Sequence, residues 1–403
     1  MTPAAIAAFL RTRRVTPTLA FTFDAAGNPS FARTGEARYF DAAGVVQVAA
    51  TGVLRNAHYV AARRALLLEP ARTNLCTRSE EFDLWTSTDT TVTANAINAP
   101  NGTLTADLVT ATLAFGTRRR TITFTGDGEK SASIFVKAGT ALTPFVSIND
   151  STAGVARHRV RITWTGGVPA LSTVDGSGTL YQPIALGDGW YWIGFSAVGV
   201  VAANTNTLSV WAGGNTTGSL YVWGGQVHDQ SIPTSYIPTA AATVARNAET
   251  LSVAVPQSWQ AMTFYARIPY ESGTGFSQGT YFALKPSAAS PVISINRNTT
   301  GNYRISHNNG STTVHGAVGS AATLGAVIEI RGIVYADGSV QAGISVNGGA
   351  ESMGAVSAAN AFSGTQPDRV EFGSVLNAPL LFSHFLVANG VRSLAQLRSA
   401  AGV

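Results

Sequence analysis

Residues 275–279, Gly-Phe-Ser-Gln-Gly, have the Gly-x-Ser-x-Gly pattern of a hydrolase nucleophile elbow centred on Ser277. Such an elbow needs a buried strand before the serine and a helix after it, because the helix N-terminus supports the oxyanion hole. Here polar residues 271–274 precede the serine, and the strand-like residues 280–284 follow it. We therefore expect a glycine-rich hairpin loop at this position and no nucleophile.

Paired carboxylates with the spacing of a glycosidase are also missing. Glycoside hydrolysis needs two carboxyl groups across a cleft, and one strand arrangement that supplies them is Glu-x-Asp-x-Glu. Glu81 and Asp83 begin that pattern, but Trp85 occupies the third position. Glu329 and Glu371 stand alone in strand-like segments and are expected to face solvent. We predict no catalytic residue and no enzymatic activity.

Metal ligands are equally sparse. The six histidines are scattered, with no pair at helical ligand spacing, and Cys76 is the only cysteine, so paired-cysteine zinc sites and intramolecular disulfides are excluded. We predict no metal site and no cofactor. Loop Asp and Asn oxygens leave a structural calcium ion open, although no acidic loop signature marks one.

Sugar binding is the function that these residue types favour most. It uses aromatic faces against apolar ring faces, together with hydrogen bonds from Asn, Asp or Arg. A polar and aromatic hairpin near residue 300 combines these types and is our predicted glycan contact: Arg297, Asn298, Tyr303, Arg304, His307 and Asn308. Five tryptophans, at 164, 190, 192, 211 and 223, lie inside strand patterns and are expected to be core.

Composition points to a turn-rich β-protein. Only 12% of the 403 residues are charged, 41 are Gly, and the basic excess is 27 − 22 = +5. No recognised module or continuous basic face supports nucleic-acid binding, whereas an anionic polysaccharide or lipopolysaccharide suits the bias. No apolar run approaches the roughly 20 residues that span a bilayer, and residues 1–14 lack a signal-peptide pattern.

The order of patterns along the chain predicts its organisation. Residues 2–14 have a capped, amphipathic helical pattern, and hairpin-like units follow as far as residue 75. Period-two alternation, as in residues 121–125 and 159–165, predicts half-buried strands. Residues 231–246 are expected to be a linker. Asp337-Gly338 predicts a two-residue hairpin turn, and Ser393 is expected to start a short C-terminal helix.

Residues 66–75 have the motif Leu-Leu-Leu-Glu-Pro-Ala-Arg-Thr-Asn-Leu, and Ser79-Glu80-Glu81-Phe82 follows it. Further sequence motifs lie at residues 99–103, 136–139, 189–191, 221–227 and 233–239. We call these motifs phrases. Over residues 20–245 the chain thereby resembles a family of phage and prophage structural proteins, some of them fibre or tail components. The resemblance implies a carbohydrate-binding-module-like jelly roll without catalytic residues. Residues 250–403 resemble a concanavalin-like or laminin-G-like sandwich.

Taken together, these patterns predict an all-β chain of two tandem antiparallel β-sandwiches of jelly-roll type. Residues 1–75 are a helix-and-hairpin attachment region, 76–247 the jelly roll, and 248–403 the second sandwich with its short C-terminal helix. The predicted function is a fibre or spike component that binds host cell-surface glycan. Two alternatives are a structural decoration or baseplate adaptor that contacts other virion proteins, and a polysaccharide depolymerase or esterase.

The predicted setting follows from the same resemblance. The protein is expected in a phage-like virion, made in the bacterial cytoplasm without a signal peptide and without membrane insertion. Its partners are host polysaccharide or lipopolysaccharide and, through the N-terminal region, other virion proteins. A homo-oligomer is expected, and fibres in general suggest a trimer, although no heptad run in this chain supports one.

Overall fold

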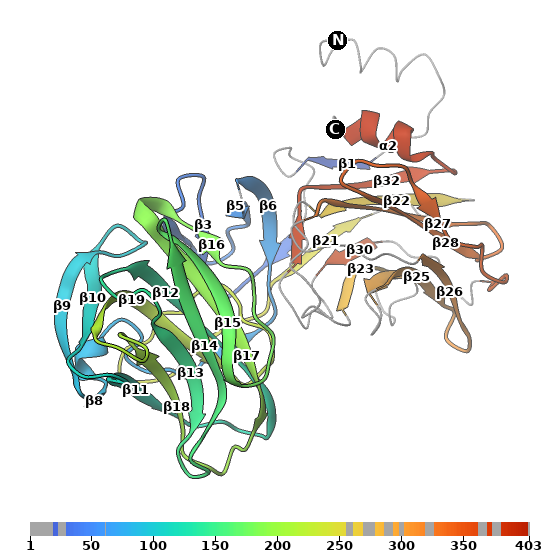
Figure 1. Cartoon of the computed structure of the whole chain (residues 1–403). Helices are drawn as coiled ribbons and strands as arrows, with labels where there is room; N and C mark the ends of the chain where they lie inside the picture. Colours follow the sequence, from blue (N-terminus) through green and yellow to red (C-terminus); the bar gives the residue numbers. More distant parts are fainter. Residues whose placement is uncertain are drawn as a thin grey trace.

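The computed structural model describes residues 19–22, 30–60, 62–254, 261–268, 279–285, 293–297, 302–318, 326–361, 369–372 and 380–401. These residues form the predicted all-β protein, with two antiparallel sandwiches and a short C-terminal helix, α2 (Leu394–Ala401) (Figure 1). In Figure 1 the first sandwich is cyan to green and the second mostly orange to red. The predicted helix at residues 2–14 lies outside the described residues.

The first sandwich is built from two six-stranded sheets. One has the order β16 (Ile184–Ala185), β17 (Trp190–Val200), β12 (Gly128–Ala138), β19 (Gly218–His228), β10 (Leu104–Ala111) and β9 (Thr90–Asn98). The other has the order β15 (Val168–Gly176), β14 (Val155–Thr165), β13 (Phe145–Asp150), β18 (Asn206–Trp211), β11 (Thr117–Ile122) and β8 (Thr86–Thr88). Two short 3-10 turns, η1 (Phe82–Leu84) and η2 (Gly187–Gly189), adjoin them.

The connections of this sandwich make it a jelly roll. The connections β10–β11, β11–β12, β12–β13, β17–β18 and β18–β19 cross from one sheet to the other, so that β17-β12-β19-β10 in one sheet faces β14-β13-β18-β11 in the other. Alternation along β14 shows why the faces separate: Val160 and Ile162 point into the core, and Arg159 and Arg161 point outward. Each fully buried aliphatic side chain of this kind contributes about 1.5–3 kcal/mol.

The second sandwich also has two sheets. The six-stranded sheet has the order β1 (Leu19–Thr22), β32 (His384–Asn389), β22 (Met262–Ile268), β27 (Ile328–Val334), β28 (Val340–Val346) and β29 (Ser352–Met353). The seven-stranded sheet has the order β2 (Ser30–Ala32), β21 (Thr250–Ala254), β30 (Arg369–Phe372), β23 (Gly279–Lys285), β24 (Ile293–Arg297), β25 (Tyr303–Asn308) and β26 (Thr313–Val318).

The first two strands of the chain belong to this second sandwich. β1 pairs with β32, and β2 pairs with β21, so each closes one edge of a sheet that is otherwise built from residues beyond 249 (Figure 1). The sequence prediction grouped these strands in a separate attachment region, residues 1–75. That grouping does not match the strand pairing, because both strands complete the C-terminal sheets.

Three small sheets lie where the two sandwiches meet. They are β3 (Ala37–Phe40) with β4 (Val46–Ala49), β5 (Arg55–Val60) with β6 (Arg63–Leu68) and β31 (Leu380–Phe382), and β7 (Arg72–Asn74) with β20 (Val244–Arg246). Residues 232–234, 236–237 and 239, within the predicted linker, are buried here. The segment is therefore a packed connection, held by hydrogen bonds such as those from Ser235 N to Glu69 and from Ile237 N to Gln226.

Two local predictions in the second sandwich are confirmed with one refinement. The β27–β28 hairpin turns at Asp337-Gly338, but Tyr335 donates to Ser339 O, so the loop spans three residues with Gly338 at φ 76°. Ser393 caps α2: its Oγ accepts from Gln396 N, and Gln396 Oε1 accepts from Ser393 N at 3.0 Å. This reciprocal pair is a capping box.

Candidate functional site

The predicted glycan-contact hairpin corresponds to β24 and β25, and its register pairs Arg297 with Tyr303. Tyr303 and His307 are both 0% exposed, and Tyr303 packs in the core of the second sandwich with Ile305. His307 Nδ1 makes a 2.7 Å hydrogen bond with Gly338 O. The prediction is therefore wrong for Tyr303 and His307, because period-two alternation puts them on the inward face of β25.

The other predicted residues are not brought into one cluster with these two. Arg304 lies on the opposite face of β25 and donates from Nε to Asn296 Oδ1 at 2.6 Å. Asn308 is exposed, and its Oδ1 accepts from Gly310 N. Arg297 ends β24, and Asn298 lies outside the described residues. Glycan contact by Arg304 and Asn308 stays a prediction.

Glu329, one of the carboxylates considered for catalysis, serves in an ion pair. Glu329 is buried, contrary to the expected solvent-facing position, and accepts from Arg398 Nη2 and from Tyr265 Oη at 2.6 Å. Burial alone would raise the pKa of Glu329, but hydrogen bonds from Arg398 and Tyr265 lower it. A general acid needs the opposite shift at neutral pH. Ser277 lies outside the described residues.

The recurring phrase at residues 66–75 has a structural role at the meeting point of the sandwiches. Its Glu69 is buried and receives Arg55 Nη1 at 2.7 Å and Arg246 Nη1 at 2.8 Å. Ser235 N, from the later phrase at 233–239, donates to Glu69 Oε1 at 2.7 Å. Burial raises the pKa of Glu69, but Arg246 and Arg55 more than offset this, so the carboxylate is held ionised.

A second buried carboxylate completes this cluster. Glu249 accepts from Arg33 Nη1 at 2.6 Å, from Arg55, and from the backbone N of Glu69 at 2.8 Å. We call the five side chains, Arg33, Arg55, Glu69, Arg246 and Glu249, the Arg/Glu junction. All five are buried, so each charge is stabilised by the opposite charges around it and not by water.

Asn74, also from the first phrase, is a hydrogen-bond hub. Its Nδ2 donates to Ile237 O at 2.8 Å and to Gly225 O, and its Oδ1 accepts from Cys76 N and Val227 N. The side chain is 0% exposed. Asn74 therefore joins the chain entering the jelly roll to the chain leaving it.

A different surface offers ligand-binding chemistry: the outward side of β13, β14 and β18. We call it the Trp211 face, and it comprises Phe145, Ser147, Asn149, Arg159, Arg161, Thr207, Ser209 and Trp211. Of these, Asn149, Arg159, Arg161 and Trp211 are partly exposed, and the other four are buried. The register aligns Trp211 with Phe145, and Phe145 with Arg161. Leu208 and Val210 point the other way, into the core. Trp211 is only partly buried, in contrast to the expected core position.

The indole of Trp211 is held in a defined orientation. Its Nε1 donates to Ser147 Oγ at 2.8 Å, and the Arg159 guanidinium lies 4.7 Å from the ring centroid. Arg159 also pairs with Asp175 at 2.7 Å, whereas its buried Nε has no hydrogen-bond partner among the described residues. Beside them, Arg161 lies 5.5 Å from the ring centroid of Phe145.

Phe115 adds a second aromatic ring at the rim of this face. It is 50% exposed and meets Trp211 edge-on, with ring centroids 6.5 Å apart. Its backbone has φ 62°, and Phe115 N donates to Gly214 O. A bulky residue in the left-handed region is strained by about 1–3 kcal/mol, which the surrounding loops must offset.

The Trp211 face was missed at the level of sequence because all strand tryptophans were assigned to the core. A signal was present: in residues 207–211, Thr-Leu-Ser-Val-Trp, the tryptophan shares its phase with Thr207 and Ser209. Period-two alternation places all three on the polar side of the strand.

Among the described residues, no group of three or more His, Cys, Asp or Glu side chains is arranged to hold a metal ion. The part of the chain that the structure covers also contains no helix with the length and apolar character needed to cross a bilayer. Comparison with protein-family models and with curated proteins gives no match to this chain.

Proposed function

We propose that this protein is a non-enzymatic, glycan-binding component of a phage-type particle, and that the Trp211 face binds an anionic cell-surface polysaccharide. The observation that carries the proposal is the partly exposed Trp211, fixed by Ser147 and flanked by Arg159 on the polar side of a jelly-roll sheet. An oriented indole offers a flat apolar surface to one face of a sugar ring.

The neighbouring polar groups suit the rest of such a ligand. Arg159 and Arg161 supply planar donor sets for carboxylate or phosphate groups, which arginine recognises better than lysine. Asn149, which is partly exposed, donates from Nδ2 to the buried Ser209 Oγ at 2.9 Å and presents an amide group on the same face. A single shallow face of this kind binds weakly, so an oligomer that presents several copies would gain avidity.

The assignment to a particle rests on the phrases that resemble those of phage and prophage structural proteins. Their residues meet at the Arg/Glu junction and at Asn74, where they hold together the chain entering and leaving the jelly roll. The phrases therefore support a shared architecture, and the ligand assignment depends on the Trp211 face alone.

The test is binding of the purified full chain to intact host-like cells before and after enzymatic removal of surface polysaccharide. We expect binding that is lost with the polysaccharide and falls at least tenfold in Trp211→Ala and in Arg159→Gln. Arg38→Gln, which removes a partly exposed arginine that is paired with Glu36 and lies outside the Trp211 face, is the charge-matched control and should bind like the parent. Equal binding by Trp211→Ala and the parent chain would overturn the assignment of this face.

A structural adaptor is the second candidate, and one observation favours it. Leu113, Phe115 and Leu142 are 58%, 50% and 72% exposed, and their loops lie at the same end of the jelly roll. Exposed apolar residues gathered at one end can serve a protein contact. If assembled particles require Leu142 but bind cells independently of Trp211, the adaptor function replaces glycan binding.

A further inference from the structure

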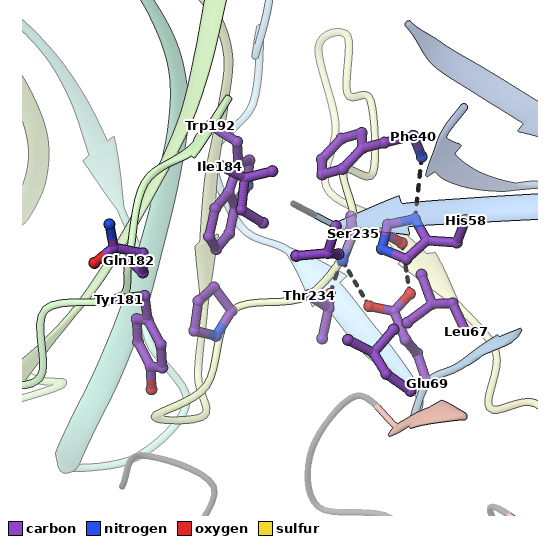
Figure 2. Close-up of a pocket in the computed structure, with 13 residues that line it drawn as sticks. Phe40, His58, Leu67, Glu69, Tyr181, Gln182, Ile184, Trp192, Thr234 and Ser235 are labelled. Atoms are coloured by element: carbon purple, nitrogen blue, oxygen red, sulfur yellow. Dashed lines mark hydrogen bonds between the residues drawn. The ribbon is translucent and has the colours of Figure 1, made fainter. Parts of the chain in front are cut away.

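A cavity of about 100 Å³ lies between the jelly roll and the small sheets that join the two sandwiches (Figure 2). One wall comes from β16 and β17 and the residues before them, and the opposite wall comes from β3, β5 and β6. Residues 233–235 and Leu381 complete it. The cavity is thus lined both by residues that precede the jelly roll in the chain and by residues that follow it.

Apolar side chains form most of the lining. Figure 2 shows Ile184 and Trp192 on one side and Phe40 and Leu67 on the other. Trp192 is 8% exposed and Phe40 is 5% exposed, so the walls are packed from behind. A ligand that carries many hydroxyl groups is disfavoured, because each hydroxyl buried without a partner costs about 1–3 kcal/mol.

Glu69 also lines the cavity, but its carboxylate is already satisfied. Ser235 N donates to Oε1, while Arg55, Arg246 and the Ser235 hydroxyl converge on Oε2. The cavity therefore offers no unpaired negative charge, and a cationic ligand has nothing to recognise at this position.

His58 is the buried polar group of the lining that lies outside such a network, whereas the Gln182 amide is at an exposed position. Its Nδ1 accepts the backbone N–H of Phe40 at 3.1 Å, so the neutral ring carries its proton on Nε2. Burial, followed by the charge of Arg55, lowers the pKa of His58 to about 3, and the ring is neutral at pH 7. The side chain is 5% exposed, and no described residue accepts from Nε2.

Figure 2 shows Nε2 on the side of the His58 ring that faces the cavity, away from Phe40 N. We propose that the cavity binds a small, neutral molecule with an apolar body and one accepting oxygen, which receives a hydrogen bond from His58 Nε2. Such a ligand fills the apolar space and accepts from the Nε2–H donor that faces it.

This site is separate from the Trp211 face and does not depend on glycan binding. Because its walls come from the jelly roll, from the small sheets and from β31, a bound molecule stabilises their contact. The expected ligand is the size of a six-membered ring with a carbonyl group.

Cyclohexanone and methylenecyclohexane are matched probes, because the second replaces the C=O oxygen with a CH2 group of similar shape. We expect cyclohexanone to bind the full chain more tightly, by ligand-observed NMR and by quenching of Trp192 fluorescence with Trp192→Phe as reference. His58→Asn keeps an acceptor for Phe40 N–H but removes the Nε2 donor. It should weaken cyclohexanone binding about three- to tenfold, the range of one neutral hydrogen bond, and leave methylenecyclohexane unaffected.

Ile184→Phe fills the cavity and should abolish binding of both probes, whereas Val198→Ala, at an exposed position in β17, should change neither. Equal affinity for both probes, or cyclohexanone binding that survives His58→Asn, would overturn the proposal. Failure of the parent chain to bind cyclohexanone would also overturn it. Self-association that is lost in Ile184→Phe would then identify a second copy as the occupant.

Discussion

Glu69 and Glu249, which are 180 residues apart in the chain, lie side by side: the backbone N of Glu69 donates to Glu249 Oε2 at 2.8 Å. Two buried carboxylates this close repel each other, and Arg33, Arg55 and Arg246 compensate for both. The arrangement ties β6, at the N-terminal side of the jelly roll, to the residue that precedes β21 of the second sandwich. Charge pairing thereby fixes the path of the chain into and out of the jelly roll.

Removing one carboxylate should therefore be costly. Glu249→Gln leaves Arg33 buried without its counter-charge and leaves Arg55 with Glu69 alone, and loss of a buried partner lowers the free energy of unfolding by about 3–5 kcal/mol. Urea unfolding monitored by tryptophan fluorescence measures it. Glu36→Gln, which breaks the solvent-exposed pair with Arg38, should leave the unfolding midpoint unchanged. Equal midpoints for the two variants would contradict the role of the Arg/Glu junction.

Acidification should destabilise the fold between pH 6.5 and pH 3. Burial is the main cause that lowers the pKa of both His58 and His228 to about 3. Below pH 6.5 the unfolded chain takes up protons that the folded chain does not, so stability falls with pH, by about 2 kcal/mol per histidine at pH 5. Stability curves at pH 7 and pH 5 measure the loss, and the double variant His58→Asn/His228→Asn should flatten it. An unchanged slope in that variant would assign the effect to other groups.

Asn74→Ala should be among the most destabilising substitutions in the jelly roll. It leaves two buried backbone N–H groups and two carbonyl groups without their partner, and each unsatisfied group costs about 1–3 kcal/mol. Asn74→Asp retains the acceptor for Cys76 N and Val227 N, but it sets a buried carboxylate oxygen against the carbonyls of Ile237 and Gly225 and should also be strongly destabilising. Thermal unfolding measures both losses, and a parent-like midpoint for either variant would contradict the hub.

The lone cysteine should be inert in the native protein. Cys76 is 0% exposed, and burial raises the pKa of its thiol. Because the thiolate is the reactive form, a disulfide reagent at pH 8 should modify no thiol in native buffer and one thiol per chain in guanidinium chloride. Rapid native labelling would mean that the region around Asn74 opens readily.

The capping box of α2 offers a small and specific test. Ser393→Ala removes the acceptor for Gln396 N and should lower the free energy of unfolding by about 1 kcal/mol. Ser399→Ala, at an exposed position within the helix, is the matched control. If both variants unfold at the same urea concentration, the cap does not stabilise the helix.

Period-two patterns made the strands and sandwiches predictable, because alternation is a local property of the sequence. The same alternation also indicates which face of a strand a polar or aromatic residue occupies, although its residue type suggests the other face. Ile305 is a clear core residue, so its i±2 neighbours Tyr303 and His307 share its inward face, and a polar, aromatic appearance does not change that phase. Trp211 is the converse: an aromatic residue in the polar phase of β18.

Long-range pairing could not be predicted from the sequence. The pattern of β2 fits a strand, but nothing local shows that its partner is β21, more than two hundred residues later. Glu329 illustrates the same limit, because its burial depends on Arg398 in a distant helix. The cavity beside His58 likewise arises only when three separate parts of the chain meet.

The pairing of β1 and β2 with the C-terminal sheets has a consequence for synthesis on the ribosome. The jelly roll emerges complete while these two strands still await partners that are not yet translated, so both must remain unpaired until the last strands appear. Unpaired strands are templates for association with other chains. Nascent chains of this protein are therefore most exposed to mispairing after the jelly roll has folded and before β32 leaves the exit tunnel.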